Sequence, residues 1–376
     1  MRILWNELKK IFTWKTMLLL LFINAVLYFL LIEFYITNFP SGDNSYSYNI
    51  AVEMVEKYGD AMDEDEFIDF QNTYEEKLEE TNRYLQSRED AIVVGLDTYE
   101  KFQAYDWSNP SEEARALEND VFFDNTIDLF WELQERERLI EFYNIRKNTP
   151  EVTNVNKRDR LMELIAEEKF GVYAEIVIWN FKSFIKGVGI VILFSVVLVI
   201  SPIILRDRSR GLLLLQYTSK KGRNLFKTKI LAGYIATFIV ITGLLAVYFS
   251  VYSLNNTDMF FNVRVNTFIW NESWFDPTFF QFIMLCIAAI YLIGFFFVTL
   301  TMSFSNVVPN MVSLIGIQIP FVVGFLIFGL NRLLPDMINI WNPKWLAPVS
   351  FSSMVIVSII IIYFLVKREK KVEVLL

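Results

Sequence analysis

The side chains that could do chemistry are few in this sequence. The chain has no histidine and a single cysteine, Cys286. Zinc sites built on histidine, Ser-His-Asp triads and HExxH proteases are therefore excluded. Cys286 lies inside the apolar stretch FIMLCIAAIYL, where the reactive thiolate is disfavoured, so we interpret it as a core residue. The sequence also lacks a G-x-x-x-x-G-K-[ST] phosphate-binding loop. We expect no enzyme activity in this chain, and any ATP hydrolysis must come from another polypeptide.

Positive charge is concentrated in one stretch, RDRSRGLLLLQYTSKKGRNLFKTKIL, from Arg206 to Leu231. It carries eight Lys or Arg residues and one acid, and long apolar runs lie on both sides of it. Four successive leucines stand near its middle. Apolar side chains inside a charged rim are typical of a surface that binds a partner, with the leucines filling a groove and the charges orienting the contact. The alternative is that the charges only fix the topology of the chain.

The elements that must position this stretch are apolar helices. Hydrophobic residues make up 54% of the chain, and the mean hydropathy is +0.34, which is high for a soluble protein. A run of about 20 apolar residues can cross a hydrocarbon core roughly 30 Å thick. Six such runs lie near residues 17–36, 187–205, 230–254, 279–302, 307–330 and 349–366. We therefore predict an all-α polytopic membrane protein with six transmembrane helices. The first run lacks a small-x-small cleavage site and should remain as an anchor.

The distribution of Lys and Arg predicts the orientation, because positively charged loops resist translocation. With the amino terminus inside, 16 cations fall in the amino-terminal segment, the stretch 206–229 and the carboxyl-terminal tail. We expect both termini to be cytoplasmic, in a bacterial cell membrane.

Residues 38–181 differ from the rest of the chain in charge. They contain 34 Asp and Glu against 14 Lys and Arg, a net charge of −20. Their apolar residues recur at helical spacing. The first stripe consists of Phe67, Phe70, Tyr74, Leu78 and Leu85, and a second, after a predicted N-cap at Ser111, of Phe122, Leu129, Leu133 and Ile140.

These stripes predict an antiparallel helical bundle, an acidic extracellular domain inserted between spans 1 and 2. A third helical piece, beginning at NKRDR, is expected to run continuously into the second span. The acidic surface is interpreted as a solvated face, with attraction of cationic peptides or metal ions as the alternative.

The stretch that follows the second apolar run carries a recognisable order of residues. Asp207 and Gly211 are separated by three residues and are followed by the leucines, a Thr-Ser pair, Arg223 and Lys229. This order resembles the signature of ABC exporter permeases of the six-span, type V class. In that family the segment is a coupling helix that docks on the nucleotide-binding subunit. The resemblance assigns ATPase coupling to Asp207, Gly211, Leu212, Leu213, Leu214, Leu215, Arg223 and Lys229.

Two further segments agree with the resemblance. The start of the chain places Leu4, Leu8, Ile11 and Phe12 on one face, with Arg2, Glu7, Lys9 and Lys10 elsewhere, which predicts an amphipathic interface helix over residues 1–16. Residues 331–348 contain three prolines and two tryptophans, which favour an external re-entrant hairpin. An ordinary outer loop is the alternative.

Polar residues inside the spans are candidates for the transport pathway, because hydrocarbon penalises them unless they face protein or water. Asn24, Asn306, Asn310 and Gln318 qualify, and Pro309 and Pro320 should kink the fifth span beside them. Hydrogen bonding between helices is the alternative role for each amide. Glu33 lies near a span boundary and is expected to reach water. We expect no metal site.

The expected domain order is the interface helix 1–16, span 1 at 17–37, the acidic domain 38–181, span 2 at 182–205, the coupling segment 206–229, and spans 3–6 with a short basic tail in 230–376. The resemblance implies the transmembrane subunit of an ATP-driven exporter for an amphipathic or hydrophobic substrate such as an antimicrobial peptide. ATP and Mg would be bound by ATPase partners. A second permease, identical or homologous, and membrane lipids are further expected partners, and nucleic acid is not. Transport of a cation or small solute, and a non-transporting sensor or scaffold with an extracellular ligand-binding domain, are the alternatives.

Overall fold

The computed structural model describes residues 2–41, 43–124, 129–147, 154–167, 172–209, 211, 222 and 224–371. These residues form helices, turns and isolated β-bridges, and no strand occurs within the described ranges. The all-helical class predicted from the sequence is therefore confirmed for this part of the chain. The chain divides into two compact units. The apolar unit comprises Met1–Asn38, Asn180–Asn256 and Phe280–Leu376, and the polar unit comprises Phe39–Trp179 and Thr257–Phe279.

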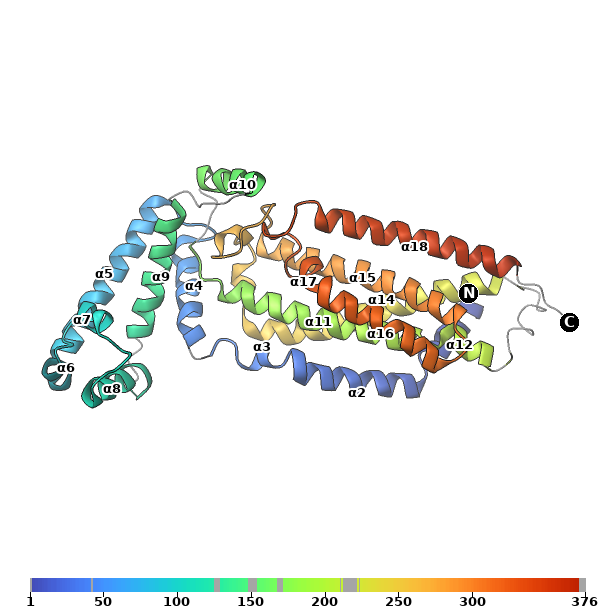
Figure 1. The fold of residues 1–376 in the computed structure, drawn as a ribbon, viewed down its shortest axis with the longest axis horizontal. Coiled ribbons are helices and arrows are strands. Elements are labelled where there is room, and N and C mark those ends of the chain that lie inside the picture. The colour runs from blue at the N-terminus through green and yellow to red at the C-terminus, as the bar shows by residue number, and fades with distance from the viewer. Residues whose placement is uncertain are drawn as a thin grey trace. The chain divides into compact units, whose positions relative to one another are not determined.

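Six helices are long and apolar enough to cross a membrane, which indicates a multi-pass membrane protein. They are α2 (Trp14–Leu31), α11 (Ile176–Ile200), α14 (Asn224–Tyr252), α15 (Phe279–Val307), α16 (Met311–Phe328) and α18 (Leu346–Lys371), and Figure 1 shows them lengthwise. A short helix, α12 (Pro202–Ser209), follows α11. α11 starts at Ile176, ahead of the expected residue 182, and α2 ends at Leu31, before Glu33 and the short helix α3 (Phe34–Thr37).

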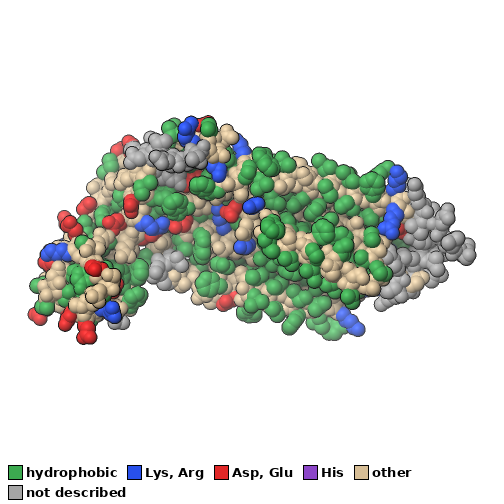
Figure 2. Space-filling model, viewed as in Figure 1, with side chains coloured by type: hydrophobic (Ala, Val, Ile, Leu, Met, Phe, Trp, Pro, Cys, Tyr) green, Lys and Arg blue, Asp and Glu red, His purple; other side chains and the backbone are tan. Residues whose placement is uncertain are grey.

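α11 is the central helix of the apolar unit. In the most apolar 18-residue stretch of α11, 72% of the residues are buried, whereas in the corresponding stretches of α2 and α18 only 6% are buried. Glycine permits close approach to α11: a Cβ at Gly187 would lie 2.7 Å from Leu31 O, and one at Gly189 would lie 2.6 Å from Leu334 Cδ2. The outer helices leave hydrophobic side chains exposed over most of the visible face of this unit, as a lipid-facing surface requires (Figure 2).

The amino-terminal helix α1 (Arg2–Ile11) packs against α14 and α12. Ile11 is buried, and Leu4, Leu8 and Phe12 are half-buried. Glu7 lies on the same face and is only 3% exposed. Glu7 was expected to lie away from the apolar residues, but it is buried because its position is one helical turn from Leu4 and from Ile11.

The segment between α16 and α18, where a re-entrant hairpin was expected, contains the four-residue helix α17 (Leu330–Leu333) followed by turns. Leu330, Leu334 and Ile340 are buried, while Trp341 and Trp345 are exposed. The turn carbonyl of Leu334 accepts a weak hydrogen bond from Cys286 Sγ at 3.7 Å. The buried leucines make this segment part of the packing around α11.

In the polar unit, three longer helices, α4 (Asp43–Tyr58), α5 (Glu64–Gln86) and α9 (Leu129–Lys147), pack together. α5 begins with a capping box in which Asp63 and Glu66 bond each other's backbone N–H groups. Three short helices, α6 (Glu89–Val94), α7 (Tyr99–Ala104) and α8 (Glu112–Asn119), supply the remaining side chains of a hydrophobic core with α5 and α9. Asp and Glu side chains are exposed over this unit in Figure 2.

The polar unit corrects three expectations. Ser111 does cap a helix, but α8 gives way to a π-helical turn, η1 (Asp120–Asp124), so the second stripe does not lie on one helix. The third piece, α10 (Val155–Ala166), does not continue into α11, because Tyr173 is extended and forms a β-bridge with Phe268. The unit is also discontinuous in sequence, since residues 257–279 fold with residues 39–179. Arg160 holds these parts together through an ion pair with Asp276 at 2.6 Å.

Candidate functional site

The two ends of the charged stretch are positioned by α12 and α14. Pro202 at the first position of α12 suits the start of a helix, where its missing N–H is not needed. Asp207 stands on this short helix, and Lys229 stands near the start of α14. The last turn of α1 brings Lys10 to the same place.

These residues form a chain of charged contacts. Lys229 Nζ lies 2.6 Å from Asp207 Oδ2. Lys10 Nζ lies 3.5 Å from the same carboxylate oxygen and 2.7 Å from Glu7 Oε1. Arg206 Nη1 donates a hydrogen bond of 2.8 Å to the carbonyl oxygen of Lys10. We call Glu7, Lys10, Arg206, Asp207 and Lys229 the Asp207 cluster.

The centre of the Asp207 cluster is buried. The side chains of Lys229 and Asp207 are 3% and 4% exposed, whereas that of Lys10 is 41% exposed. Burial lowers the pKa of Lys10, but the carboxylates of Glu7 and Asp207 raise it more, so its pKa lies above its usual value. Glu7 Oε2 has no hydrogen-bond partner among the described residues, which is unusual for a buried carboxylate.

The arrangement of the Asp207 cluster has a mechanical use. Its two carboxylates are paired with the ammonium groups of Lys10 and Lys229. It joins the end of α12 to the start of α14 and ties both to α1, so the base of the intervening stretch is fixed. Gly211 has a φ of 65° and open space around its Cβ position. The other residues assigned to coupling, Leu212, Leu213, Leu214, Leu215 and Arg223, lie outside the described residues.

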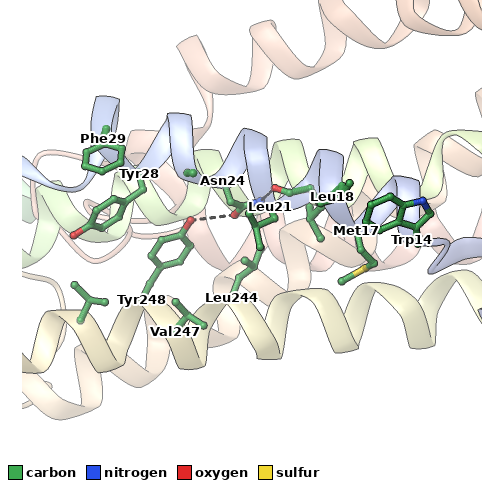
Figure 3. Close-up of a pocket in the computed structure, with 13 residues that line it drawn as sticks. Trp14, Met17, Leu18, Leu21, Asn24, Tyr28, Phe29, Leu244, Val247 and Tyr248 are labelled. Atoms are coloured by element: carbon green, nitrogen blue, oxygen red, sulfur yellow. Dashed lines mark hydrogen bonds between the residues drawn. The ribbon is translucent and has the colours of Figure 1, made fainter.

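Asn24 is the centre of a second polar group, where α2 contacts α11 and α14. Its Nδ2 donates to Leu20 O at 2.8 Å and to Ser195 Oγ at 2.9 Å. Tyr248 Oη donates to Asn24 Oδ1 at 3.0 Å, the bond drawn as a dashed line in Figure 3. The amide therefore links α2, α11 and α14, as hydrogen bonds between helices do in hydrocarbon.

The other candidate pathway residues have separate environments. Gln318 is buried on α16, and its Oε1 lies 3.1 Å from Ser201 Oγ. Asn310 is the N-cap of α16 and accepts a hydrogen bond from Ser313 N, which explains its polarity structurally. Asn306 is buried near the end of α15. Of the two prolines expected to kink the fifth span, Pro320 is inside α16, whereas Pro309 lies between α15 and α16.

Two cavities flank α2. One, of about 870 Å³, lies between α2 and α14. Figure 3 shows its apolar side chains along the two helices, from Trp14 and Met17 at one end to Tyr28 and Phe29 at the other. The second, of about 540 Å³, is lined by α2, α11, α12 and α16. Within the described ranges, no group of three or more Cys, Asp or Glu side chains is placed to hold a metal ion.

Comparison of the chain with family models, with curated proteins and with solved structures finds no significant match. Asp207, Lys229 and Asn24 were predicted from the sequence, whereas Glu7 and Lys10 of the Asp207 cluster and the Asn24 partners Ser195 and Tyr248 were not. The spacing of Glu7 from Leu4 and Ile11 was a usable signal for its burial. Nothing in the sequence around Ser195 and Tyr248 predicts that they contact Asn24, because these contacts depend on which faces of α11 and α14 pack against α2.

Proposed function

We propose that this chain is the transmembrane permease subunit of an ATP-driven ABC exporter in a bacterial cell membrane. Six apolar helices supply the membrane part of such a subunit. The chain has no phosphate-binding loop, so ATP and Mg bind to separate ATPase subunits. Six spans make half of a pathway, and a second permease, identical or homologous, completes it. Both termini and the stretch 206–229 face the cytoplasm, and the polar unit lies outside the cell.

The observation that carries this proposal is the buried ion pair between Asp207 and Lys229. Charges that only set topology need no burial, and burying a pair carries a desolvation cost of several kcal/mol per ion. A pair placed at the two ends of a leucine-containing stretch instead supplies a stiff base for a segment that transmits force. Through Lys10 the same base holds α1, the expected interface helix, so motion of a docked ATPase would reach α12 and α14 together.

The larger cavity beside α2 supports an amphipathic or hydrophobic substrate. It is lined almost entirely by apolar side chains, with the bond between Asn24 and Tyr248 on its wall. A membrane-active peptide has an apolar face that such a cavity accepts and a polar face that keeps it near the bilayer surface.

The test is purification of the tagged full-length chain from membranes of its natural host into lipid nanodiscs. We expect a co-purifying polypeptide whose own sequence carries a G-x-x-x-x-G-K-[ST] loop, and ATP hydrolysis that rises when cationic amphipathic peptides are added. If the rate of ATP hydrolysis is unchanged by every peptide but rises with a salt or small solute, the cation or small-solute alternative is favoured. A chain that purifies without any ATPase would favour the sensor or scaffold alternative, which the separate core of the polar unit also permits.

A further inference from the structure

The smaller cavity beside α2 has the features of a binding site for one lipid molecule. Its volume of about 540 Å³ lies within the range of roughly 300–1,000 Å³ that is usual for ligand pockets. Its walls are apolar along most of their length and include Leu19, Ile23, Phe194, Ile315 and Ile319. It belongs entirely to the apolar unit.

One end of this cavity is cationic. Lys15 and Arg206 line it, and none of the lining residues is acidic. The hydrogen bond from Arg206 to the Lys10 carbonyl holds the guanidinium at this end. Six charged residues, Glu7, Lys10, Lys15, Arg206, Asp207 and Lys229, give four cations and two acids and a net charge of +2. The cavity therefore attracts an anion at its mouth.

The length of the cavity matches one leaflet of a bilayer. Met311 and Val323, both on its wall, are twelve positions apart on α16, which corresponds to about 18 Å at 1.5 Å per residue. Half of a hydrocarbon core is about 15 Å thick. The lining residues show which end of the cavity is cationic. Lys15, Arg206 and Met311 lie near that end, and Ile23, Phe194 and Val323 lie near the apolar end.

A polar group between the two ends lacks a partner. The hydroxyl of Ser201 has one proton to donate. Its Oγ lies 2.6 Å from one acceptor, Val197 O, and 3.1 Å from another, Gln318 Oε1. Gln318 lines the cavity, is 6% exposed, and its Nε2 has no hydrogen-bond partner among the described residues. A buried amide of this kind is stabilised by a ligand that offers an acceptor.

We propose that this cavity binds an anionic phospholipid. Lys15 and Arg206 contact the phosphate, the apolar wall holds one acyl chain, and Gln318 donates to an ester carbonyl of the lipid. This assignment needs no transport activity and stands apart from the proposed function. It differs from general attraction of anionic lipid to basic loops, because it requires both the charges and the apolar cavity behind them.

The test is native mass spectrometry of the full-length chain released from detergent, after titration with phosphatidylglycerol or with phosphatidylcholine of identical acyl chains. We expect one phosphatidylglycerol retained per chain and weaker retention of phosphatidylcholine. Each cation near an anionic lipid contributes binding free energy, so Lys15→Gln should weaken phosphatidylglycerol binding about fivefold. The double change Lys15→Gln with Arg206→Gln should weaken it about 30-fold. Lys367→Gln, which removes another exposed basic residue, should leave it unchanged.

A second pair of variants tests the apolar wall. Leu18 and Leu19 are neighbours on α2 and are each 48% exposed, but Leu19 lines this cavity and Leu18 lines the larger one. Leu19→Trp should abolish retention of phosphatidylglycerol, and Leu18→Trp should preserve it. Equal retention of the two lipids, competition by inorganic phosphate alone, or unchanged binding in Leu19→Trp would each overturn the proposal. Loss of a dimer in Leu19→Trp without loss of lipid would also overturn it, by showing a second copy of the chain in the cavity.

Discussion

Lys229 Nζ and Asp207 Oδ2 lie 2.6 Å apart and are almost completely shielded from solvent. The two residues stand at opposite ends of the stretch that contains the four leucines. Their contact holds the two ends of that stretch together, where α12 ends and α14 begins. Because Lys10 contacts the same carboxylate, the position of α1 depends on this pair as well.

Removing one member of this pair should be strongly destabilising. Asp207→Ala or Lys229→Ala leaves a buried charge without its partner and should lower the free energy of unfolding by about 3–5 kcal/mol. The double change Asp207→Leu with Lys229→Met removes both charges and should cost much less than the two single changes together. Unfolding of the detergent-solubilised chain in a denaturant titration measures these values.

The matched control for these variants is Lys227→Ala, which removes an exposed lysine from the same helix. It should change the free energy of unfolding by no more than about 0.5 kcal/mol. If Lys229→Ala behaves like Lys227→Ala, the ion pair contributes nothing to the fold.

The spans were predictable because hydropathy depends on residues that are close in sequence. A run of about 20 apolar residues is sufficient to identify a helix such as α15. The start of α11 was misplaced because Ile176–Phe181 precede two lysines, which mark a membrane boundary in the sequence but belong to the helix in the structure. The break at η1 was missed because helical periodicity continues through it.

The candidate site was predictable at two of its positions. Asp207 and Lys229 were assigned from the order of residues around the leucines, and their contact explains why both types occur there. Glu7 and Lys10 contact each other, but they were not assigned to the site, because the contact that joins them to it, between Lys10 and Asp207, connects residues 197 positions apart. The membership of residues 257–279 in the polar unit was missed for the same reason: contacts such as that between Arg160 and Asp276 connect parts of the sequence that share no local pattern.

Close packing at Gly187 predicts a second destabilising substitution, through overpacking and not through an unpaired charge. A Cβ there would lie 2.7 Å from the backbone oxygen of Leu31, so Gly187→Ala should destabilise the chain by about 1–3 kcal/mol through overpacking. Gly316→Ala is the control, because no heavy atom lies within 4 Å of its Cβ position and alanine favours the helix. Thermal unfolding of both variants gives the comparison. Equal melting temperatures would show that α2 does not pack on α11 at this point.

The polar unit should lose stability in acid through Asp69. Hydrogen bonds from Lys57 and then from Tyr58 hold the pKa of Asp69 below its ordinary value of 3.8. Because the pKa is lower in the folded state, the stabilisation is present above pH 3.8 and disappears as the pH falls through the folded value. Asp69→Asn should therefore flatten the dependence of melting temperature on pH in this range.

Glu76→Gln is the control for the acid titration, since Glu76 is an exposed acid on the same helix. Tryptophan fluorescence of the full-length chain reports the melting temperature. An unchanged pH dependence in Asp69→Asn would remove Asp69 from the acid response.

Topology can be tested by labelling engineered thiols in intact cells. In a Cys286→Ser background, a membrane-impermeant maleimide should label Ser87→Cys, which replaces an exposed residue at the end of α5. It should not label Ser219→Cys, whose position lies outside the described residues, unless the cells are opened. Labelling of Ser219→Cys with protection of Ser87→Cys would reverse the proposed orientation.

The most direct test of the exporter proposal is whether the leucine stretch docks on an ATPase. Placing two carboxylates in an apolar groove costs several kcal/mol, enough to break an ordinary subunit contact. Leu213→Asp with Leu214→Asp should therefore abolish co-purification with the ATPase, while Leu213→Ile with Leu214→Ile should retain it at equal amounts of inserted chain. Stable co-purification and peptide-stimulated ATP hydrolysis in the double aspartate variant would contradict docking through this stretch.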